Sequence, residues 1–230
     1  MRLSLFVAKS GYASRRKADI LIEDGQVEVN GIVVREPYFQ VDPGDIVKAR
    51  GKKLTISEKI YLAFNKPEGV TTTLQDKFAE KKVMDFIPQK FNGVFPVGRL
   101  DKNSSGLLIL TNDGDLCYRL THPKFFVEKE YFIRVCGLMP DNVCLLAKKG
   151  IIDEGEHLKA KFVKIVKRDK RSTVCEVVVC EGKKRHIRRL FSGLGFPVME
   201  LRRIRIDRLL LGDLKSGEYR VISKEMIADP

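Results

Sequence analysis

The sequence predicts an α+β fold in two parts, a small N-terminal α/β module and a larger α+β domain with a mixed sheet. Hydrophobic residues make up 43% of the 230 residues, enough to build a core. Residues 1–58 hold helix-like and strand-like segments of their own and end in a polar stretch. In residues 59–230, several strand-like segments follow one another without a helix between them. That order favours a mixed sheet over a doubly wound parallel one.

The first expected domain, residues 1–58, contains one clearly marked helix over residues 15–23. Ser14 is a good N-cap residue, and apolar residues recur behind it at helical spacing. Gly25 is expected to end the helix because glycine adopts the backbone conformation that a helix end needs.

The strands of the same module are predicted from alternating residues and from turn residues. The pair Asn30–Gly31 favours a tight turn that joins two strands in a hairpin. The expected strands cover residues 26–30, 32–34 and 46–48. The polar residues 50–59 are expected to form a linker to the second domain.

In the second expected domain, residues 59–230, β-branched and aromatic residues mark the strands, and helically spaced apolar residues mark the helices. The expected strands cover residues 60–65, 106–111, 131–135, 160–167 and 173–180. The expected helices lie near residues 115–120, 140–148 and 185–194.

Positive charge is concentrated in one part of the chain. The net charge is +13, and residues 161–208 alone carry 15 basic and 5 acidic side chains. Such a field attracts polyanions, so nucleic acid is favoured over a solvated basic face that only keeps the protein in solution. Arg15, Arg16 and Lys17 oppose the helix dipole at the start of their helix, which suggests an external anion. We expect these three residues to contact RNA.

The composition argues against a membrane protein, a metal site and a disulfide framework. No apolar run approaches the roughly 20 residues that a membrane-spanning helix needs, and the first residues lack a signal-peptide layout. We therefore expect a cytoplasmic protein. The five cysteines contain no Cys-x-x-Cys pair, and the three histidines lie far apart. This spacing is unlike that of metal ligands and predicts buried free thiols.

One acidic residue stands in a turn bracketed by glycines. Residues 98–108 read GRLDKNSSGLL, with Asp101 between Arg99 and Lys102 and an apolar strand after it. Glycines let backbone and ligand approach closely, and flanking cations favour an ionised carboxylate that can act as a nucleophile or base. On these residues alone, an ordinary surface turn remains the simpler interpretation.

A basic motif, residues 181–190, reads EGKKRHIRRL. Its apolar residues have helical spacing and must face the core, so the basic side chains lie on the other faces and on the entry turn. A helix start rich in cations suits phosphate capture, and a solvated basic face is an equal alternative. The basic residues are Lys183, Lys184, Arg185, Arg188 and Arg189.

Two shorter elements carry single residues of interest. The run EKEY over residues 128–131 opens a strand, where a core position is the better interpretation for Tyr131. The run NKPEGV over residues 65–70 predicts a rigid turn with Lys66 exposed.

Together these segments resemble known families. The run SGYASRRKADILIEDGQVEVNGIVV, followed by DPGDIV, resembles the S4 RNA-binding domain. GRLD followed by SGLL resembles the most specific signature of RNA pseudouridine synthases. The order of the elements is most similar to the RsuA/RluB branch, which modifies ribosomal RNA.

The resemblance implies a fold and a reaction. The fold is an S4-type α/β module before an α+β catalytic domain with a long, curved mixed sheet. The reaction is the isomerisation of uridine to pseudouridine in ribosomal RNA, with large-subunit 23S RNA slightly favoured over small-subunit 16S RNA. Asp101 is then the nucleophile and attacks either the sugar or the uracil ring. Tyr131 stacks on the target base and is a candidate proton carrier, and Arg188 pairs with Asp101.

The same resemblance sets the expected partners. The protein is expected to bind ribosomal RNA or a ribosomal assembly intermediate as a monomer, without membrane, metal or cofactor. In the basic motif over residues 181–190, the expected RNA contacts are Lys183, Lys184, Arg185 and Arg189. Elsewhere in the catalytic domain, they are Lys66, Arg99 and Lys102.

Two other functions are weaker alternatives. A non-catalytic RNA chaperone would explain the charge and the S4-like module but not the intact Asp101 turn. A metal-dependent RNA nuclease would need several convergent carboxylates, and only Asp101 lies in a suitable motif.

Overall fold

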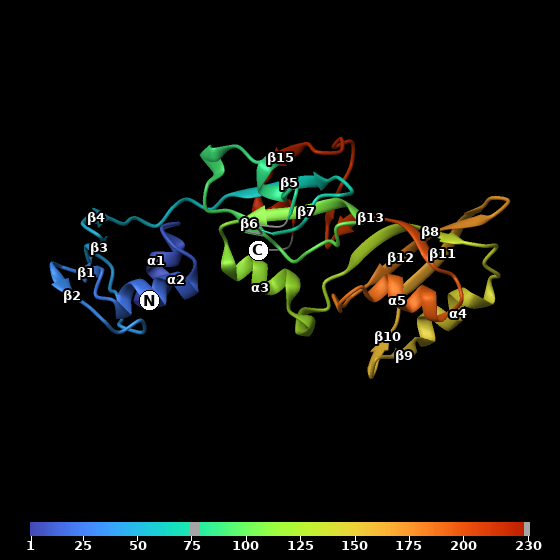
Figure 1. Ribbon diagram of the computed structural model, residues 1–230, viewed down its shortest axis with the longest axis horizontal. Helices are drawn as coiled ribbons and strands as arrows, with labels where there is room; N and C mark the ends of the chain where they lie inside the picture. Colours follow the sequence, from blue (N-terminus) through green and yellow to red (C-terminus); the bar gives the residue numbers. More distant parts are fainter. Residues whose placement is uncertain (74–78, 228–230) are drawn as a thin grey trace. The chain divides into compact units, whose positions relative to one another are not determined.

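Figure 1 shows the computed structural model, which describes residues 1–73 and 79–227. The chain forms two compact units. The smaller unit comprises Met1–Ile60 with Gln89–Val94, and the larger one comprises Tyr61–Pro88 with Phe95–Pro230.

The smaller unit combines a helix pair with an antiparallel sheet in the order β2-β1-β3-β4. The helices are α1 (Leu3–Lys9) and α2 (Arg15–Glu23), and the strands are β1 (Val27–Val29), β2 (Ile32–Val33), β3 (Val47–Ala49) and β4 (Lys52–Lys53). The predicted cap is confirmed, since the Ser14 hydroxyl accepts a hydrogen bond from the Lys17 N–H at 3.4 Å.

The stretch over residues 50–59 is only partly a linker, which corrects the expectation. Its residues Lys52–Lys53 pair with β3, and Leu54 is buried in the core of the smaller unit. A strand of two residues produces no alternation, so its pattern could not be recognised in the sequence.

A long mixed sheet is the centre of the larger unit, as predicted. Its order is β11-β12-β8-β13-β7-β5-β15, with β14 added to β13 and β6 to β7. All pairings are antiparallel except the parallel pair β13 and β7. The strands are β5 (Tyr61–Lys66), β6 (Phe95–Pro96), β7 (Ser105–Thr111), β8 (Lys129–Cys136), β11 (Phe162–Arg168), β12 (Ser172–Val179), β13 (Val198–Ile206), β14 (Leu209–Leu210) and β15 (Tyr219–Val221). A separate hairpin consists of β9 (Ile151–Asp153) and β10 (Glu156–Leu158).

The helices of the larger unit cover two cores. α4 (Asn142–Lys149) and α5 (His186–Gly193) pack with β8 and β12, and Figure 1 shows both helices beside these strands. α3 (Gly114–Thr121) packs with β5 and β7 around the second core. Short 3₁₀ helices are η1 (Val83–Phe86), η2 (Gln89–Phe91) in the smaller unit, η3 (Pro123–Phe125) and η4 (Lys224–Met226).

β13 is the main element that was not predicted. Residues 198–206 read VMELRRIRI, and the charged side chains hide the strand pattern. β13 nevertheless lies between β8 and β7 at the centre of the sheet, with Leu201, Arg203 and Ile206 buried. One of those buried positions is an arginine, which no hydrophobic pattern would place in a strand interior.

The thiol expectation is only partly right. All five cysteines are free, but Cys175 alone is buried, and Cys136 is exposed. None of the helices in the described ranges is long and apolar enough to cross a membrane.

Candidate active site

An open cleft lies in the larger unit, between the turn before β7, the strands β8 and β13, and the start of α5. Its volume is about 160 Å³. Asp101, Tyr131 and Arg188 all line it, although they come from a turn, a strand and a helix. The three residues expected to be catalytic therefore share one cavity, and their roles stay predictions.

The turn that carries Asp101 is fixed by hydrogen bonds to its backbone. The Thr72 hydroxyl donates to the Leu100 carbonyl at 2.8 Å and accepts from the Leu100 N–H at 3.3 Å. The Ser104 N–H donates to the Asp101 carbonyl at 3.0 Å. Asp101 itself is exposed, and no hydrogen bond or ion pair reaches its carboxylate in the chain as described, residues 1–73 and 79–227. Its oxygens are therefore available to a substrate.

Lys66 supports the same turn from inside the protein. It is 0% exposed, so the expectation of an exposed lysine that contacts RNA is wrong. Its ammonium donates to three backbone carbonyls, those of Pro67 (2.9 Å), Lys102 (3.4 Å) and Ser104 (2.8 Å). Burial lowers the pKa of Lys66 to about 8, and the carboxylates of Glu68 and Asp101 oppose that shift. A buried cation with three carbonyl partners is suited to fixing the turn.

Arg188 reaches the turn from α5. Its guanidinium donates to three acceptors, the carbonyls of Asn103 (2.5 Å) and Val198 (3.0 Å) and the hydroxyl of Ser104 (3.4 Å). Burial and then the nearby Arg185 lower the pKa of Arg188, whereas Asp101 acts in the opposite direction. The two residues are thus electrostatically coupled. A direct ion pair between Arg188 and Asp101 is not present among the described residues, so Arg188 holds the backbone of the turn instead.

Arg203 is the principal site residue that the sequence did not reveal. It lies on β13 between Gly106 of β7 and Tyr131 of β8, and it is 3% exposed. Its Nε donates to the Leu107 carbonyl at 2.7 Å, and its Nη1 donates to the Tyr131 hydroxyl at 3.5 Å. Its Nη2 is buried and has no hydrogen-bond partner in the described part of the chain. Arg203 also lines the cleft, so the wall of the cleft contains a buried donor whose hydrogen bond is not satisfied by the described residues.

Tyr131 is both a core residue and a wall of the cleft. It is 8% exposed and belongs to the core that α4 and α5 cover. Its ring centroid lies 6.0 Å from the Arg203 guanidinium carbon, within cation–π range. Most of the remaining walls are apolar or basic, and the acidic Glu181 also lines the cleft. The apolar and basic residues are Val97, Leu100, Val179, Ile187 and Leu201 with Arg99, Lys129, Lys183 and Arg185. Apolar walls with a few polar groups suit a flat, partly polar ligand.

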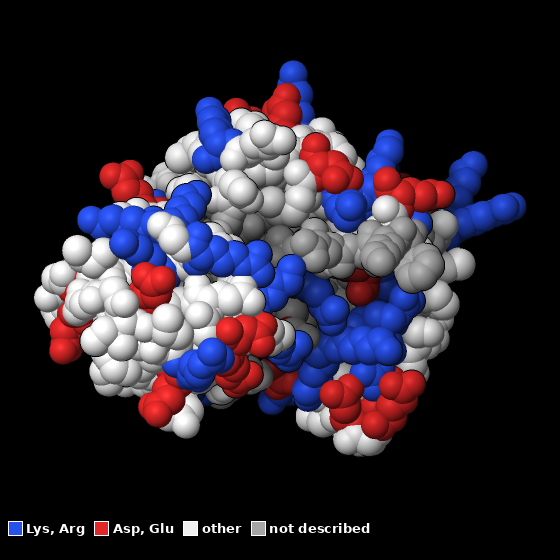
Figure 2. Space-filling view, turned by 60° about the vertical axis from the view of Figure 1, so that its left-hand side comes forward, with Lys and Arg blue, Asp and Glu red and all other residues white. Residues whose placement is uncertain are grey.

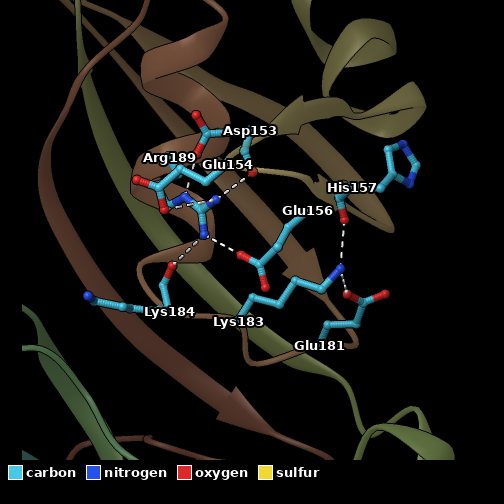
Figure 3. Close-up of polar contacts among 8 residues, drawn as sticks. All are labelled: Asp153, Glu154, Glu156, His157, Glu181, Lys183, Lys184 and Arg189. Atoms are coloured by element: carbon cyan, nitrogen blue, oxygen red, sulfur yellow. Dashed lines mark hydrogen bonds and ion pairs between the residues drawn. The ribbon is translucent and has the colours of Figure 1, made fainter.

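Figure 3 shows that Arg189 is engaged by the β9–β10 hairpin. Its guanidinium forms ion pairs with Asp153 and, at 2.5 Å, with Glu156, and the Glu154 carboxylate lies at 3.6 Å. The Arg189 side chain is 14% exposed. Its charge is already compensated by these carboxylates, which weighs against the expected contact between Arg189 and RNA. The acidic partners lie more than 30 residues away in sequence, so the basic motif alone could not reveal them.

The other expected RNA contacts remain on the surface. Lys183 is half-buried beside the cleft, where it pairs with Glu181 at 2.7 Å and donates to the His157 carbonyl at 2.7 Å. The exposed ones are Arg15, Arg16 and Lys17 in the smaller unit and Arg99, Lys102, Lys184 and Arg185 in the larger unit. Figure 2 shows lysine and arginine side chains spread over the displayed surface, with smaller groups of acidic side chains between them.

His186, the first residue of α5, is a buried neighbour of these groups. It is 5% exposed, its Nε2 donates to the Lys159 carbonyl at 3.0 Å, and burial lowers its pKa. It is therefore neutral near pH 7 and fixes the start of α5. Among the described residues, no group of three or more His, Cys, Asp or Glu side chains could hold a metal ion.

The sequence and the fold are similar to those of known proteins. The family model described as RNA pseudouridylate synthase matches residues 60–193, and the S4 domain model matches residues 1–47. Ribosomal large subunit pseudouridine synthase B of Bacillus subtilis (strain 168) is 38% identical over 228 residues, which cover 96% of this chain and 92% of the relative. An RNA pseudouridine synthase of Aquifex aeolicus (strain VF5) is 37% identical, with 99% and 92% covered. The crystal structure of a pseudouridylate synthase superposes with a TM-score of 0.68 and 28% identity, covering 98% of this chain and 97% of that one.

Proposed function

Because the chain belongs to the family of RNA pseudouridine synthases, we propose that it isomerises uridine in ribosomal RNA with Asp101 as the nucleophile. Its membership makes it an RNA isomerase with an S4 domain. The relative from Bacillus subtilis carries the large ribosomal subunit in its name, and it matches along nearly the whole chain. That similarity supports large-subunit ribosomal RNA as the substrate.

The observation that carries the proposal is the state of Asp101. Its carboxylate is exposed in the cleft and has no partner among the described residues, while Thr72, Lys66 and Arg188 hold the backbone around it. A nucleophile needs this combination of fixed position and available oxygen atoms. A surface turn of no function would not need a fully buried lysine to support it.

The reaction conserves every atom of the substrate. The bond between uracil N1 and ribose C1′ breaks, a bond forms between C5 and C1′, C5 loses a proton and N1 gains one. Asp101 attacks the ribose or the uracil ring, and the carboxylate is released again at the end of the cycle. A uridine within folded RNA must first be flipped into the cleft to reach this carboxylate.

We assign the holding of the flipped base to Tyr131 and Arg203. The Tyr131 ring forms part of the cleft wall, and aromatic rings stack on bases with little dependence on their identity. Arg203 presents the buried Nη2 donor, which fits a carbonyl oxygen of uracil. We assign stacking to Tyr131, and its hydroxyl is the candidate carrier of the C5 proton.

The decisive test is Asp101→Asn. Asparagine keeps the shape but is not a nucleophile, so pseudouridine formation in a large-subunit RNA transcript should be abolished while RNA binding stays near the wild-type level. Asp213→Asn, at a surface carboxylate that is 91% exposed, is the matched control and should keep full activity. Product formed at the wild-type rate by pure Asp101→Asn protein would exclude Asp101 as the nucleophile.

Arg188 is tested separately because its proposed role is to position the turn. A hydrogen bond from a charged donor contributes about 1.5–3 kcal/mol, so Arg188→Ala should lower turnover at saturating RNA about 10- to 150-fold. Arg188→Lys, which keeps one donor, should recover part of that loss. If Arg188→Ala raises only the RNA concentration required, the residue is a phosphate contact instead.

The two roles of Tyr131 can also be separated. Tyr131→Phe keeps the ring and removes the hydroxyl, whereas Tyr131→Leu removes both. If the hydroxyl carries the C5 proton, Tyr131→Phe should bind RNA normally, turn over slowly and show an isotope effect with RNA deuterated at C5. A Tyr131→Phe enzyme with wild-type turnover would restrict Tyr131 to stacking.

A further inference from the structure

A cluster of exposed rings lies at the junction of α3 and η3 in the larger unit. The Tyr118 and His122 ring centroids are 4.8 Å apart, and Tyr118 meets Phe125 edge-on at 5.7 Å. Tyr118 is 48% exposed and Phe125 is 41% exposed. The Lys124 ammonium lies 4.9 Å from the Tyr118 ring centroid and 4.8 Å from that of Phe125. Aromatic side chains gathered with a cation at the surface are a typical feature of nucleic-acid binding sites.

Phe126 follows this cluster in the sequence, and it is more exposed than Tyr118 and Phe125. It is 69% exposed, and its ring contacts no other aromatic ring within the described ranges. Its φ of +50° is in the left-handed region, which is unfavourable for a bulky residue. The backbone conformation ends η3, since Phe126 is its C-cap and the Phe126 N–H donates to the Pro123 carbonyl at 3.1 Å. Capping explains the backbone but not the exposed ring at a position that favours glycine or asparagine, so the ring points to a ligand.

The cluster adjoins the cleft through the chain itself. Thr121 and Lys129 both line the cleft, and the ring-bearing segment connects them. Phe126 precedes Lys129 by three residues, which span at most about 11 Å even when fully extended. An RNA strand that places a uridine beside Asp101 therefore brings the neighbouring nucleotides within reach of Phe126.

We propose that Phe125 and Phe126, with Lys124, form a stacking site for an unpaired base next to the target uridine. The inference rests on the proposed function, since it assumes that a uridine is flipped into the cleft. Flipping removes a stacking partner from each neighbouring base, and exposed rings replace that partner. Lys124 contributes a positive charge for the adjoining phosphate. The site offers ring faces and one cation, so it binds a base without reading its identity.

The test compares Phe126 variants by their affinity for a protein-free transcript of large-subunit ribosomal RNA. Phe126→Ala should weaken binding about 5- to 150-fold, the range for losing one base stacked on an aromatic ring. Phe126→Tyr should bind like wild type, and Phe126→Leu should behave like the alanine variant, since leucine is apolar but cannot stack. None of these substitutions removes a ring contact, so the fold should be unaffected.

Phe162 supplies a matched control on the same unit. It is 42% exposed and has the Lys148 ammonium 5.6 Å from its ring centroid, but it lies on β11 and does not line the cleft. Phe162→Ala should leave the affinity unchanged. The salt dependence separates the two parts of the site, because Lys124→Ala should reduce the salt slope by about 0.7–0.9 and Phe126→Ala should not change it.

The outcomes distinguish the stacking site from the proposed reaction. Wild-type affinity in Phe126→Ala, with pseudouridine still formed by the wild-type protein, would overturn the stacking site and favour a protein partner for the exposed rings. Loss of affinity in Phe126→Ala, with no pseudouridine formed by the wild-type protein, would retain an RNA-stacking surface and overturn the proposed reaction.

Discussion

Gly106 brings the catalytic turn and β13 into direct contact, and its replacement by alanine should destabilise the larger unit. An alanine Cβ at this position would lie 2.2 Å from the Arg203 carbonyl oxygen and 2.7 Å from the Arg203 nitrogen. Both atoms belong to the backbone of the neighbouring strand, so no side chain can move aside. The φ of Gly106 is +102°, which also disfavours any residue with a Cβ.

The size of the effect follows from these two costs. A positive φ costs a non-glycine residue roughly 1–2 kcal/mol. Forcing an atom into a packed interior costs roughly 1–3 kcal/mol. The sum is about 2–5 kcal/mol, a large part of the roughly 5–15 kcal/mol that stabilises a typical domain. For a unit of this size the melting temperature should fall by about 4–20 °C.

Two control variants separate the backbone cost from the steric cost. Gly195→Ala has φ +86° but no atom within 4 Å of the added Cβ, so it should show only the backbone cost. Gly114→Ala is helical with open space around it, so it should be neutral or slightly stabilising. Calorimetry of all three full-length variants gives the comparison. If Gly106→Ala melts no lower than Gly195→Ala, the close approach of β7 and β13 adds no steric cost at position 106, and the reasoning is refuted.

Arg203→Lys should raise KM and slow turnover about tenfold or more, because an ammonium cannot replace the forked donors; wild-type kinetics would remove Arg203 from the site. Arg185→Gln should reduce the salt slope of RNA binding by about one unit. Arg189→Gln should leave the salt slope unchanged and lower the melting temperature. A reduced salt slope in Arg189→Gln would restore Arg189 as a phosphate contact. Burial, with the neighbouring Arg203, lowers the pKa of Lys129 to about 8. The folded state then binds fewer protons than the unfolded state between about pH 8 and 10.4, so stability rises with pH there. Lys129→Met should make that rise smaller in denaturant titrations without abolishing it, since Lys66, whose pKa is also lowered to about 8, contributes in the same range. An unchanged pH profile would contradict the shift at Lys129. Removing residues 1–58 should weaken RNA binding and leave a folded catalytic domain, whereas an insoluble product or unchanged affinity would contradict the predicted boundary.

Local signals in the sequence were sufficient for the elements that local physics determines. The helix over Arg15–Glu23 begins after Ser14 as predicted, because a cap and an apolar stripe both lie within it. The glycine-bracketed turn around Asp101 was found for the same reason. The chemical role of Asp101, in contrast, came from family resemblance and not from the residues alone.

The parts that were missed depend on contacts between distant segments. Lys66 is buried because its ammonium donates hydrogen bonds to carbonyls of the Asp101 turn. These carbonyls belong to Lys102 and Ser104, which are 36 and 38 residues further along the chain. Arg203 is buried and donates hydrogen bonds to the Leu107 carbonyl and the Tyr131 hydroxyl, which lie 96 and 72 residues away in the sequence. A charged residue looks exposed in a sequence until its partners are known, so pattern alone places such residues on the surface.

The parallel pairing of β13 with β7 has a consequence for the order in which the protein becomes functional. It joins Arg203 to Gly106, so the strand that completes the cleft is made long after the turn that carries Asp101. Closing a loop of this length is slow, and nascent chains fold from the N-terminus. A ribosome-bound chain that stops before residue 198 exposes the edges of β7 and β8 and lacks the wall that Arg203 provides. Such a chain contains Asp101 but not the complete cleft, so the site is assembled only after residues 198–206 have been made, and fragments released earlier are prone to aggregate.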